Sequence, residues 1–157
     1  MRTDGFPYNL ILQSTSFQDG GEIPKKHGYK NGNVRPHLKI SHVPSGAKSL
    51  VIIMDDPDAM GAVGRLWVHW TAWNIDPKTA EIAESLPKGT VEGVTDFGTA
   101  GYGGPAPPDK RHTYVFKMYA LNSELSLGSS ATKRQLEDAM EDHIIAQTSL
   151  SGTYAPQ

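Results

Sequence analysis

Glycine and proline interrupt this chain too often for it to be built mainly from long helices. Its 157 residues include 16 glycines and 11 prolines. One or the other therefore occurs about every six residues, and both types break regular helices. The connections richest in them lie at 44–46, 57–64, 87–93 and 98–108. The sequence thus predicts a β-rich fold of short strands joined by turns, with helix confined to the C-terminal part.

Five segments between these breaks have the residue types and patterns of β-strands. Their β-branched and aromatic side chains pack well on a pleated sheet. Strict alternation in the last segment places Tyr114, Phe116 and Met118 on one face. The third segment, 49–54, is a continuous apolar run, which is typical of a strand buried on both faces. The expected strands cover residues 9–17, 34–41, 49–54, 66–75 and 113–121.

One helix is expected, over residues 132–147. Thr132 and Gln135 have the spacing of a capping box, in which each side chain binds an amide left free at the helix start. Leu136, Met140 and Ile144 recur at helical spacing and would line one face. This face would pack against the strands.

Size and composition indicate one globular domain over residues 1–157. A chain of 17.1 kDa buries about 70% of its extended surface, which is enough for a core of its own. The formal net charge is −2 and there is no lysine- or arginine-rich run. Nucleic acids and anionic membranes require a concentrated positive field, so neither is the expected partner.

The sequence has no feature of a membrane or exported protein. There is no cysteine, which excludes disulfides and thiolate sites. The longest aliphatic run, Leu50–Met54, is far shorter than the roughly 20 residues that span a bilayer. The first eight residues lack the apolar core of a signal peptide. We therefore expect a cytoplasmic protein with no integral membrane segment.

Two segments in the middle of the chain carry polar residues that could form a site. Asp56-Pro-Asp58 directly follows the apolar run, although aspartate and proline also simply begin turns. The strand Trp67-Val-His69 continues to Trp73, and alternation places Trp67, His69 and Trp73 on one face. A histidine at such a place is more often a core residue with a satisfied ring.

A third segment, 98–109, is a glycine- and proline-rich loop that leads into His112 and Tyr114. Its glycines can adopt positive φ, and consecutive backbone N–H groups in such a loop can form a nest for an anion. The loop lacks the lysine and hydroxyl residue of a nucleotide P-loop, and it could equally be a purely structural loop. His112 and Tyr114 are two residues apart and share one face of their strand.

The order of these segments is more specific than any one of them. Asp-Pro-Asp-Ala, then Trp-x-His, then Gly-Tyr-Gly-Gly-Pro-x-Pro-Pro and His-x-Tyr resemble the phosphatidylethanolamine-binding protein family, which includes the Raf kinase inhibitor protein. The resemblance runs from about residue 4 to residue 154, and the short C-terminal end is similar to the bacterial and archaeal branch. It implies a large central antiparallel sheet packed on a smaller one, with few peripheral helices.

The resemblance also implies a small pocket for phosphate-type groups. The residues that match the family's motifs are Asp56, Asp58, Trp67, His69, Gly104, Pro105, His112 and Tyr114. Met60 stands where many members have proline, which would change one wall of the pocket. Family members often have a cis peptide before the Trp strand, which here would be Arg65–Leu66. Prokaryotic relatives often form homodimers, so a homodimer is expected.

The function expected from the residues and the resemblance is anion binding without catalysis, cofactor or metal. An anion beside aspartates is plausible if the ligand brings a proton, and we expect phosphate affinity to rise from about pH 8 toward about pH 6 as ligand and histidines gain protons. By analogy with the family, the protein would modulate a protein partner such as a kinase or protease. The alternative is a metal-dependent or other hydrolase that uses the His/Asp cluster. His27, His37 and His42 are expected to be solvated.

Overall fold

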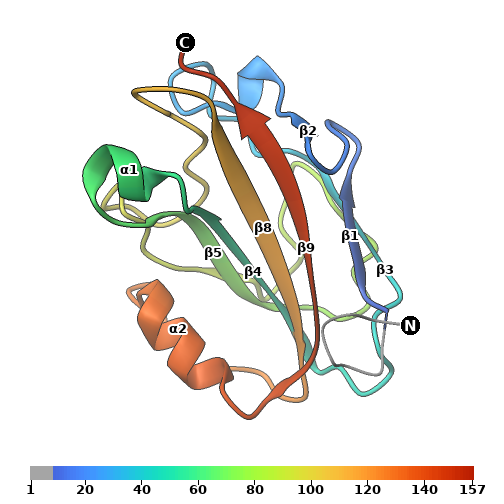
Figure 1. The fold of residues 1–157 in the computed structure, drawn as a ribbon. Helices are drawn as coiled ribbons and strands as arrows, with labels where there is room; N and C mark the ends of the chain where they lie inside the picture. The colour runs from blue at the N-terminus through green and yellow to red at the C-terminus, as the bar shows by residue number, and fades with distance from the viewer. Residues whose placement is uncertain (1–8) are drawn as a thin grey trace.

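The strands form two sheets that pack face to face (Figure 1). A computed structural model describes residues 9–157; the first eight residues, on which the signal-peptide expectation rests, lie outside the described part. In the small sheet the order is β1 (Ile11–Ser14), β3 (Leu38–Ser41), β6 (Glu81–Ile82). In the large sheet it is β2 (Gly21–Glu22), β9 (Ile144–Tyr154), β8 (His112–Leu121), β4 (Ser49–Asp56), β5 (Trp67–Ile75), β7 (Val91–Glu92).

Three short helices complete the described chain. They are a 3-10 turn, η1 (Lys25–His27), and two α-helices, α1 (Ala59–Val63) and α2 (Lys133–Met140). All strand pairs are antiparallel except β2 with β9, which is parallel. The expected β-rich architecture, a large sheet on a smaller one with few helices, is confirmed.

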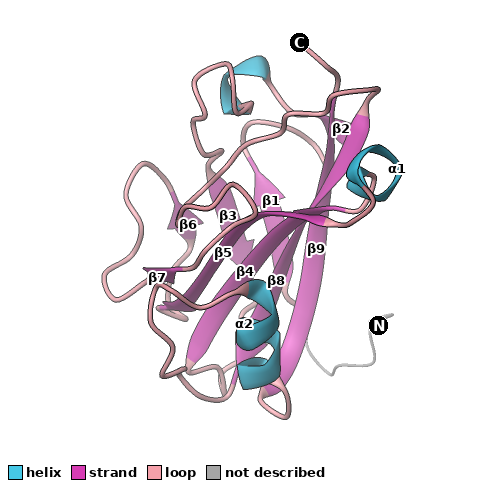
Figure 2. Cartoon of the chain, turned by 90° about the vertical axis from the view of Figure 1, so that its left-hand side faces the viewer, coloured by secondary structure: helices cyan, strands magenta, loops and turns pink. Residues whose placement is uncertain are grey.

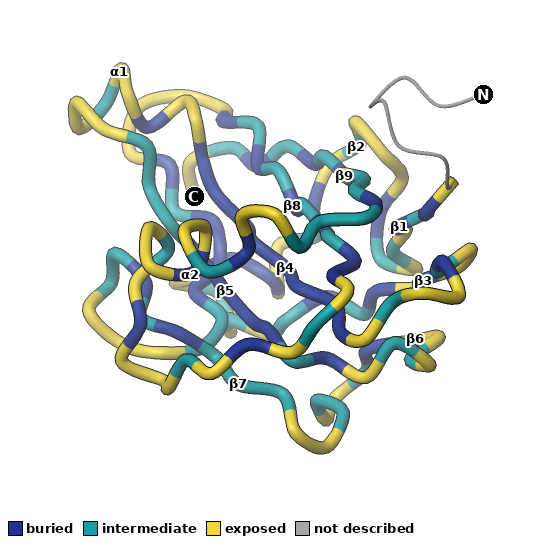
Figure 3. Tube along the Cα trace, turned by 90° about the horizontal axis from the view of Figure 1, so that it is seen from below, coloured by how far each residue is buried: buried dark blue, intermediate teal, exposed yellow. Residues whose placement is uncertain are grey.

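The main core lies between the two sheets. On β8 the side chains alternate as predicted, with Tyr114, Phe116 and Met118 fully buried against the small sheet. Leu12 of β1 and Ile40 of β3 meet them from the other side. This pairing of apolar faces explains why the strands closest to the centre are the most buried (Figure 3).

A second, smaller core lies on the outer face of the large sheet, beneath α2 (Figure 2). Val51 and Ile53 of β4 face this side, whereas Leu50 and Ile52 face the small sheet. Every residue of β4 is buried, as the continuous apolar run predicted. The segment is a central strand covered on both faces.

The expected helix over 132–147 is correct only for its first half. The capping box of Thr132 and Gln135 is present, and α2 ends at Met140. Asp142 then adopts φ +71°, the chain turns, and β9 begins at Ile144. Ile144 lies four residues after Met140, as a helix would require, but it is the first residue of β9. The residues that follow it pair with the whole length of β8, and this long-range pairing outweighs the local pattern.

Leu136 should be the main anchor of α2, because it is fully buried in the outer core. We expect Leu136→Ala to reduce the free energy of unfolding by about 2–5 kcal/mol, through lost apolar burial and the cavity left behind. Arg134→Ala is the matched control on the exposed side of the same helix and should change stability by less than about 0.5 kcal/mol. Urea unfolding of both variants measures this, and equal effects would contradict the packing described here.

Candidate functional site: a small pocket at the end of the large sheet

A cavity of about 140 Å³ opens where β4 ends and β5 and β8 begin, beside α1. It brings together residues from four separate parts of the chain. Its lining consists of Asp56, Ala59, Ala62, Val63, Trp67, His69, Phe97, Ala106, Pro108, His112 and Tyr114. Five of the eight residues predicted for the site are therefore neighbours: Asp56, Trp67, His69, His112 and Tyr114.

A β-bulge in β5 turns His69 toward this cavity. Met54 of β4 pairs with Trp70 and the next residue, Asp55, pairs with Val68, so that His69 has no partner in the ladder. A bulge of this kind re-aims a side chain and bends its strand. Strict alternation had placed His69 on the face of Trp73. The bulge separates them, because Trp73 packs beneath α2 whereas His69 lines the pocket.

The His69 ring presents a hydrogen-bond acceptor to the pocket. Its Nδ1 lies 2.7 Å from the carbonyl oxygen of Gly103. A carbonyl can only accept, so Nδ1 carries the proton and Nε2 of the neutral ring has a free lone pair. Burial lowers the pKa of His69, and this outweighs the opposing effects of the Gly103 carbonyl and of Asp56. His69 is therefore neutral near pH 7.

His112 lies between two carboxylates. Its Nδ1 is 2.6 Å from Oδ2 of Asp56, and its Nε2 is 2.7 Å from Oδ1 of Asp109. Only the protonated ring can donate to both. Burial disfavours that charge, but the bonds to Asp56 and Asp109 prevail and raise the pKa of His112 above its ordinary value. Both N–H groups of His112 are thus already engaged.

Tyr114 supplies a hydroxyl that has no partner. Its side chain is fully buried, and the hydroxyl oxygen has no hydrogen bond within residues 9–157. Burial, with Asp56 nearby, raises the pKa of Tyr114, so the hydroxyl keeps its proton. A buried hydroxyl without a partner costs free energy until something accepts its proton. The hydroxyl lies near Asp56 in the wall of the pocket.

The other three predicted residues lie around the pocket and do not line it. Asp58 is exposed; its backbone N–H donates to Asp56 Oδ1 and its carboxylate accepts from the Thr113 amide. The Gly104 N–H donates to Asn33 Oδ1, and the Pro105 carbonyl accepts from the Tyr29 amide. These contacts fix the positions of the pocket walls.

The glycine loop does not offer the expected anion nest at these amides. The N–H of Gly103 donates to the carbonyl of His69, and that of Gly104 is held by Asn33. The glycines serve close packing: a Cβ at Gly104 would lie 2.0 Å from the carbonyl oxygen of His27. The loop is thus pulled against the 27–33 segment, and its carbonyl at Gly103 faces the His69 ring.

Two expectations about the chain before β5 are wrong. Met60 is 57% exposed and does not line the cavity, so it does not alter a pocket wall. The Arg65–Leu66 peptide is trans, since there is no cis bond within residues 9–157.

Sequence reasoning missed the apolar walls and Asp109. Phe97, Ala106 and the α1 residues carry no chemical signature, and only their position beside the motifs could have pointed to them. Asp109 ends the proline-rich loop three residues before His112, and that spacing was a usable signal for their ion pair. With these walls the pocket is a largely apolar cup with few polar atoms.

Neither a metal centre nor a membrane helix is found in the described part of the chain. Within residues 9–157, no three His, Asp or Glu side chains are grouped in a way that could hold a metal ion. No helix there has the length and apolar character needed to cross a membrane.

Comparisons with known proteins agree with the fold and the motifs. The sequence profile described as phosphatidylethanolamine-binding protein matches residues 13–155. A UPF0098 protein from Chlamydia trachomatis is 43% identical over 147 residues, covering 92% of this chain and 98% of the relative. One from Methanothermobacter thermautotrophicus is 40% identical over 151 residues, with the same coverage.

Solved structures give the same result. A protein from Chlamydia trachomatis, described as a putative phosphatidylethanolamine-binding protein homologue, superposes with a TM-score of 0.88 at 41% identity and covers 94% of this chain and 98% of its own. Escherichia coli YbcL, described as a new member of the mammalian family, has a TM-score of 0.87 at 30% identity, covering 94% of this chain and 99% of its own.

The ion pair of His112 with Asp109 leads to a testable prediction. Asp109→Asn removes one of the two negative charges that stabilise the imidazolium, so the pKa of His112 should fall. Titration of the His112 ring signals by NMR measures this. Asp138→Asn, on the exposed side of α2, should leave that pKa unchanged.

The His112–Asp109 pair also determines whether the free energy of unfolding rises or falls with pH. The pKa of His112 is raised in the folded state above the ordinary 6.5, so its contribution is complete below that value and is lost as pH rises through the raised pKa. Asp109→Asn should flatten this decline. An identical pH profile of unfolding free energy in the variant would contradict the assignment.

Proposed function

This chain belongs to the phosphatidylethanolamine-binding protein family, and from that premise we propose that its pocket binds a phosphate-type group in a protonated, singly charged form. The observation that carries the proposal is the balance of hydrogen-bond donors and acceptors among the residues that line the cavity. The lining residues supply one donor, the Tyr114 hydroxyl, which has no hydrogen-bond partner within residues 9–157, together with acceptors on His69 and Asp56. A fully ionised oxyanion would meet more acceptors than donors there.

A ligand that carries its own proton matches these groups. The P–OH of a phosphate monoanion can donate to the Asp56 carboxylate or to His69 Nε2, while another phosphate oxygen accepts from Tyr114. Hydrogen bonds to a charged partner are about twice as strong as neutral ones. The proton also removes the repulsion that a second negative charge would meet beside Asp56.

The size of the cavity limits which part of a ligand enters. About 140 Å³ holds only a few heavy atoms, given that one water takes about 30 Å³ in the liquid. Inorganic phosphate or the head of a phosphomonoester fits this space. The rest of a larger ligand would lie outside, against Val63 of α1 and Pro108.

We still expect phosphate affinity to rise as the pH falls, but we now attribute this rise to protonation of the ligand and not of the histidines. His69 is neutral, and both N–H groups of His112 are occupied by carboxylates. The proton that controls affinity is therefore the ligand's own, with a second pKa near 6 for a phosphomonoester. Affinity should rise as pH falls from about 8 toward about 6.

The remaining expectations stay predictions. A binding role is proposed in preference to the metal-dependent hydrolase, because the His/Asp cluster of residues 9–157 does not form a metal-ligand group. Modulation of a kinase or protease and a homodimer rest on the family resemblance, and a cytoplasmic location rests on the sequence features described above. Met60 and Val63, both about half exposed on α1 beside the pocket, are where a partner that responds to the bound ligand would make contact.

Calorimetry with phosphate and sulfate tests the proposal. The two ions have nearly the same size, but sulfate carries no proton near pH 7 and cannot donate to Asp56 or His69. We expect saturable phosphate binding that is at least about tenfold tighter than sulfate binding, because one unpaired buried charge or acceptor costs about 1.4 kcal/mol or more.

Tyr114→Phe separates the site from the fold. The hydroxyl has no hydrogen-bond partner within residues 9–157, so its loss should leave stability unchanged or slightly higher, while phosphate affinity falls about tenfold. Tyr119→Phe, on the opposite face of β8, is the matched control and should bind phosphate normally. Equal affinity for both anions, or unchanged phosphate binding by Tyr114→Phe, would refute the proposal.

A further inference from the structure

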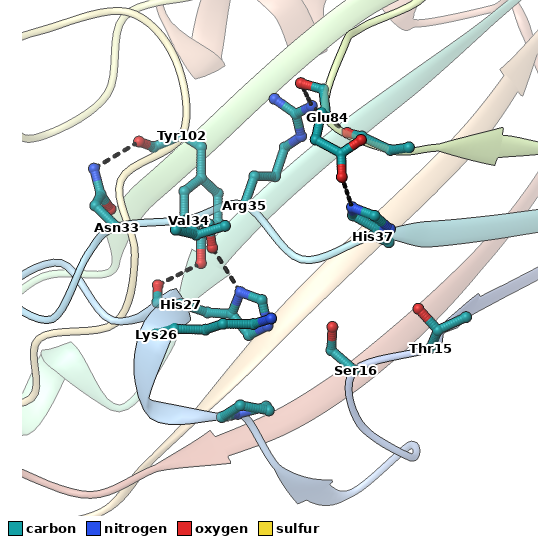
Figure 4. Close-up of a pocket in the computed structure, with 12 residues that line it drawn as sticks. Thr15, Ser16, Lys26, His27, Asn33, Val34, Arg35, His37, Glu84 and Tyr102 are labelled. Atoms are coloured by element: carbon teal, nitrogen blue, oxygen red, sulfur yellow. Dashed lines mark hydrogen bonds and ion pairs between the residues drawn. The ribbon is translucent and has the colours of Figure 1, made fainter.

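A second, larger cavity of about 680 Å³ lies at one end of the small sheet (Figure 4). β1 and β6 end there and β3 begins there, so Thr15, Ser16, His37 and Glu84, which flank these strands, line one side. η1 and the 33–35 segment form the other side. This cavity shares no lining residue with the pocket described above.

His27 of η1 lines the cavity and is not solvated, so the expectation from the sequence is wrong. Its side chain is 1% exposed, and its Nδ1 lies 2.6 Å from the carbonyl oxygen of Val34. Nδ1 must donate in that bond, which leaves Nε2 as an acceptor. Nε2 is buried and has no partner within residues 9–157, and Figure 4 shows His27 among the residues that line the cavity.

A buried histidine of this kind needs a donor from outside the described chain. Burial lowers the pKa of His27; the hydrogen bond to the Val34 carbonyl only partly opposes this, and the charge of Lys26 lowers the pKa further. The ring is therefore neutral and cannot satisfy Nε2 by protonation. An unsatisfied buried acceptor is costly, so a hydroxyl or amine that reached it would be held strongly.

Arg35 gives the cavity a positive charge. Its guanidinium lies 5.7 Å from the Trp70 ring centre and donates to the carbonyl oxygens of Ala83 and Glu84. Within residues 9–157 it has no carboxylate within ion-pair distance, and its Nε is buried without a partner. Lys26 adds a second cationic side chain to the lining.

Glu84 is the acidic side chain of the lining, and it is largely exposed. Glu84 lies 3.2 Å from Nε2 of His37, at the exposed edge of the cavity. Lys26 and Arg35 thus face the space with an excess of positive charge, and the hydroxyls of Thr15 and Ser16 add neutral donors. An anionic group would be favoured over a neutral one here.

We propose that this cavity binds a small hydroxylated organic anion, such as a hydroxy acid or a sugar phosphate. Its carboxylate or phosphate oxygens would accept from Arg35, Lys26 and the neighbouring hydroxyls, and a hydroxyl close to the charged group would donate to His27 Nε2. The volume lies within the range of small-molecule sites, about 300–1,000 Å³. A simple anion would leave Nε2 unsatisfied, and a simple polyol would leave the cations unpaired.

The test uses D-glycerate and glycerol 3-phosphate, which combine hydroxyl and charge, with propionate and glycerol as controls that each lack one of them. NMR signals of the His27 ring report binding at this cavity, and those of His69 report the other pocket, so the two sites are distinguished. Working near pH 8, where phosphomonoesters are mostly doubly charged, further disfavours the first pocket. We expect saturable shifts at His27 Nε2 with both hydroxylated anions, and binding about tenfold weaker for the controls.

Two comparisons between variants test the proposed contacts of His27 and Lys26 with the ligand. His27→Asn keeps a donor for the Val34 carbonyl but lacks the Nε2 acceptor, and it should bind both probes about tenfold more weakly than the unchanged chain. Lys26→Ala should also weaken binding, whereas Lys30→Ala, which changes another exposed lysine outside the cavity, should not. Both lysines are exposed, so these variants decide the result even if His27→Asn does not fold.

Three results would overturn the proposal. One is the absence of any His27 shift with either hydroxylated probe. Another is an equal response to propionate, which would mean that the hydroxyl is not recognised. The third is unchanged affinity in Lys26→Ala.

Discussion

The buried carboxylate of Asp56 links three of the chain segments that form the pocket. It is 3% exposed at the end of the central strand β4, where an unpaired charge would be very costly. One oxygen accepts from the Asp58 amide and so fixes the start of α1; the other accepts from His112 and so fixes β8. The bulge at His69 completes the arrangement from β5. Loss of this carboxylate would leave three chain segments without their common contact.

The way these charges are satisfied determines what the pocket can accept. Both N–H groups of His112 donate hydrogen bonds, to Asp56 and Asp109, and the Nδ1–H of His69 donates to the backbone carbonyl of Gly103. Within residues 9–157, no cationic N–H group in the pocket lining is therefore left without a partner, and in the proposed binding mode selectivity comes from matching one hydroxyl donor to several acceptors. The second cavity has the reverse balance, with cations and one unsatisfied acceptor on His27. The two cavities would thus choose anions by different means: the first by the ligand's acidic proton, the second by its charge together with a hydroxyl.

The sequence predicted the features that depend on local pattern or on a complete motif. The alternation of β8 and the capping box of α2 were correct because each is set by residues close together in the chain. The convergence of Asp56, His69 and His112 followed from the family resemblance. β9 was missed because its pairing with β8 is decided by tertiary contacts. The bulge and the burial of His27 were missed for the same reason, since neither has a signature among neighbouring residues.

The central claim is that the phosphate enters the first pocket with its proton, and counting protons during binding tests it most directly. Calorimetric titration with phosphate near pH 8, in two buffers with different heats of ionisation, gives the number of protons taken up per ligand bound. At that pH most phosphate is the dianion, so the account predicts uptake of close to one proton. Binding with no proton uptake would show that the dianion is the bound form and would contradict the account.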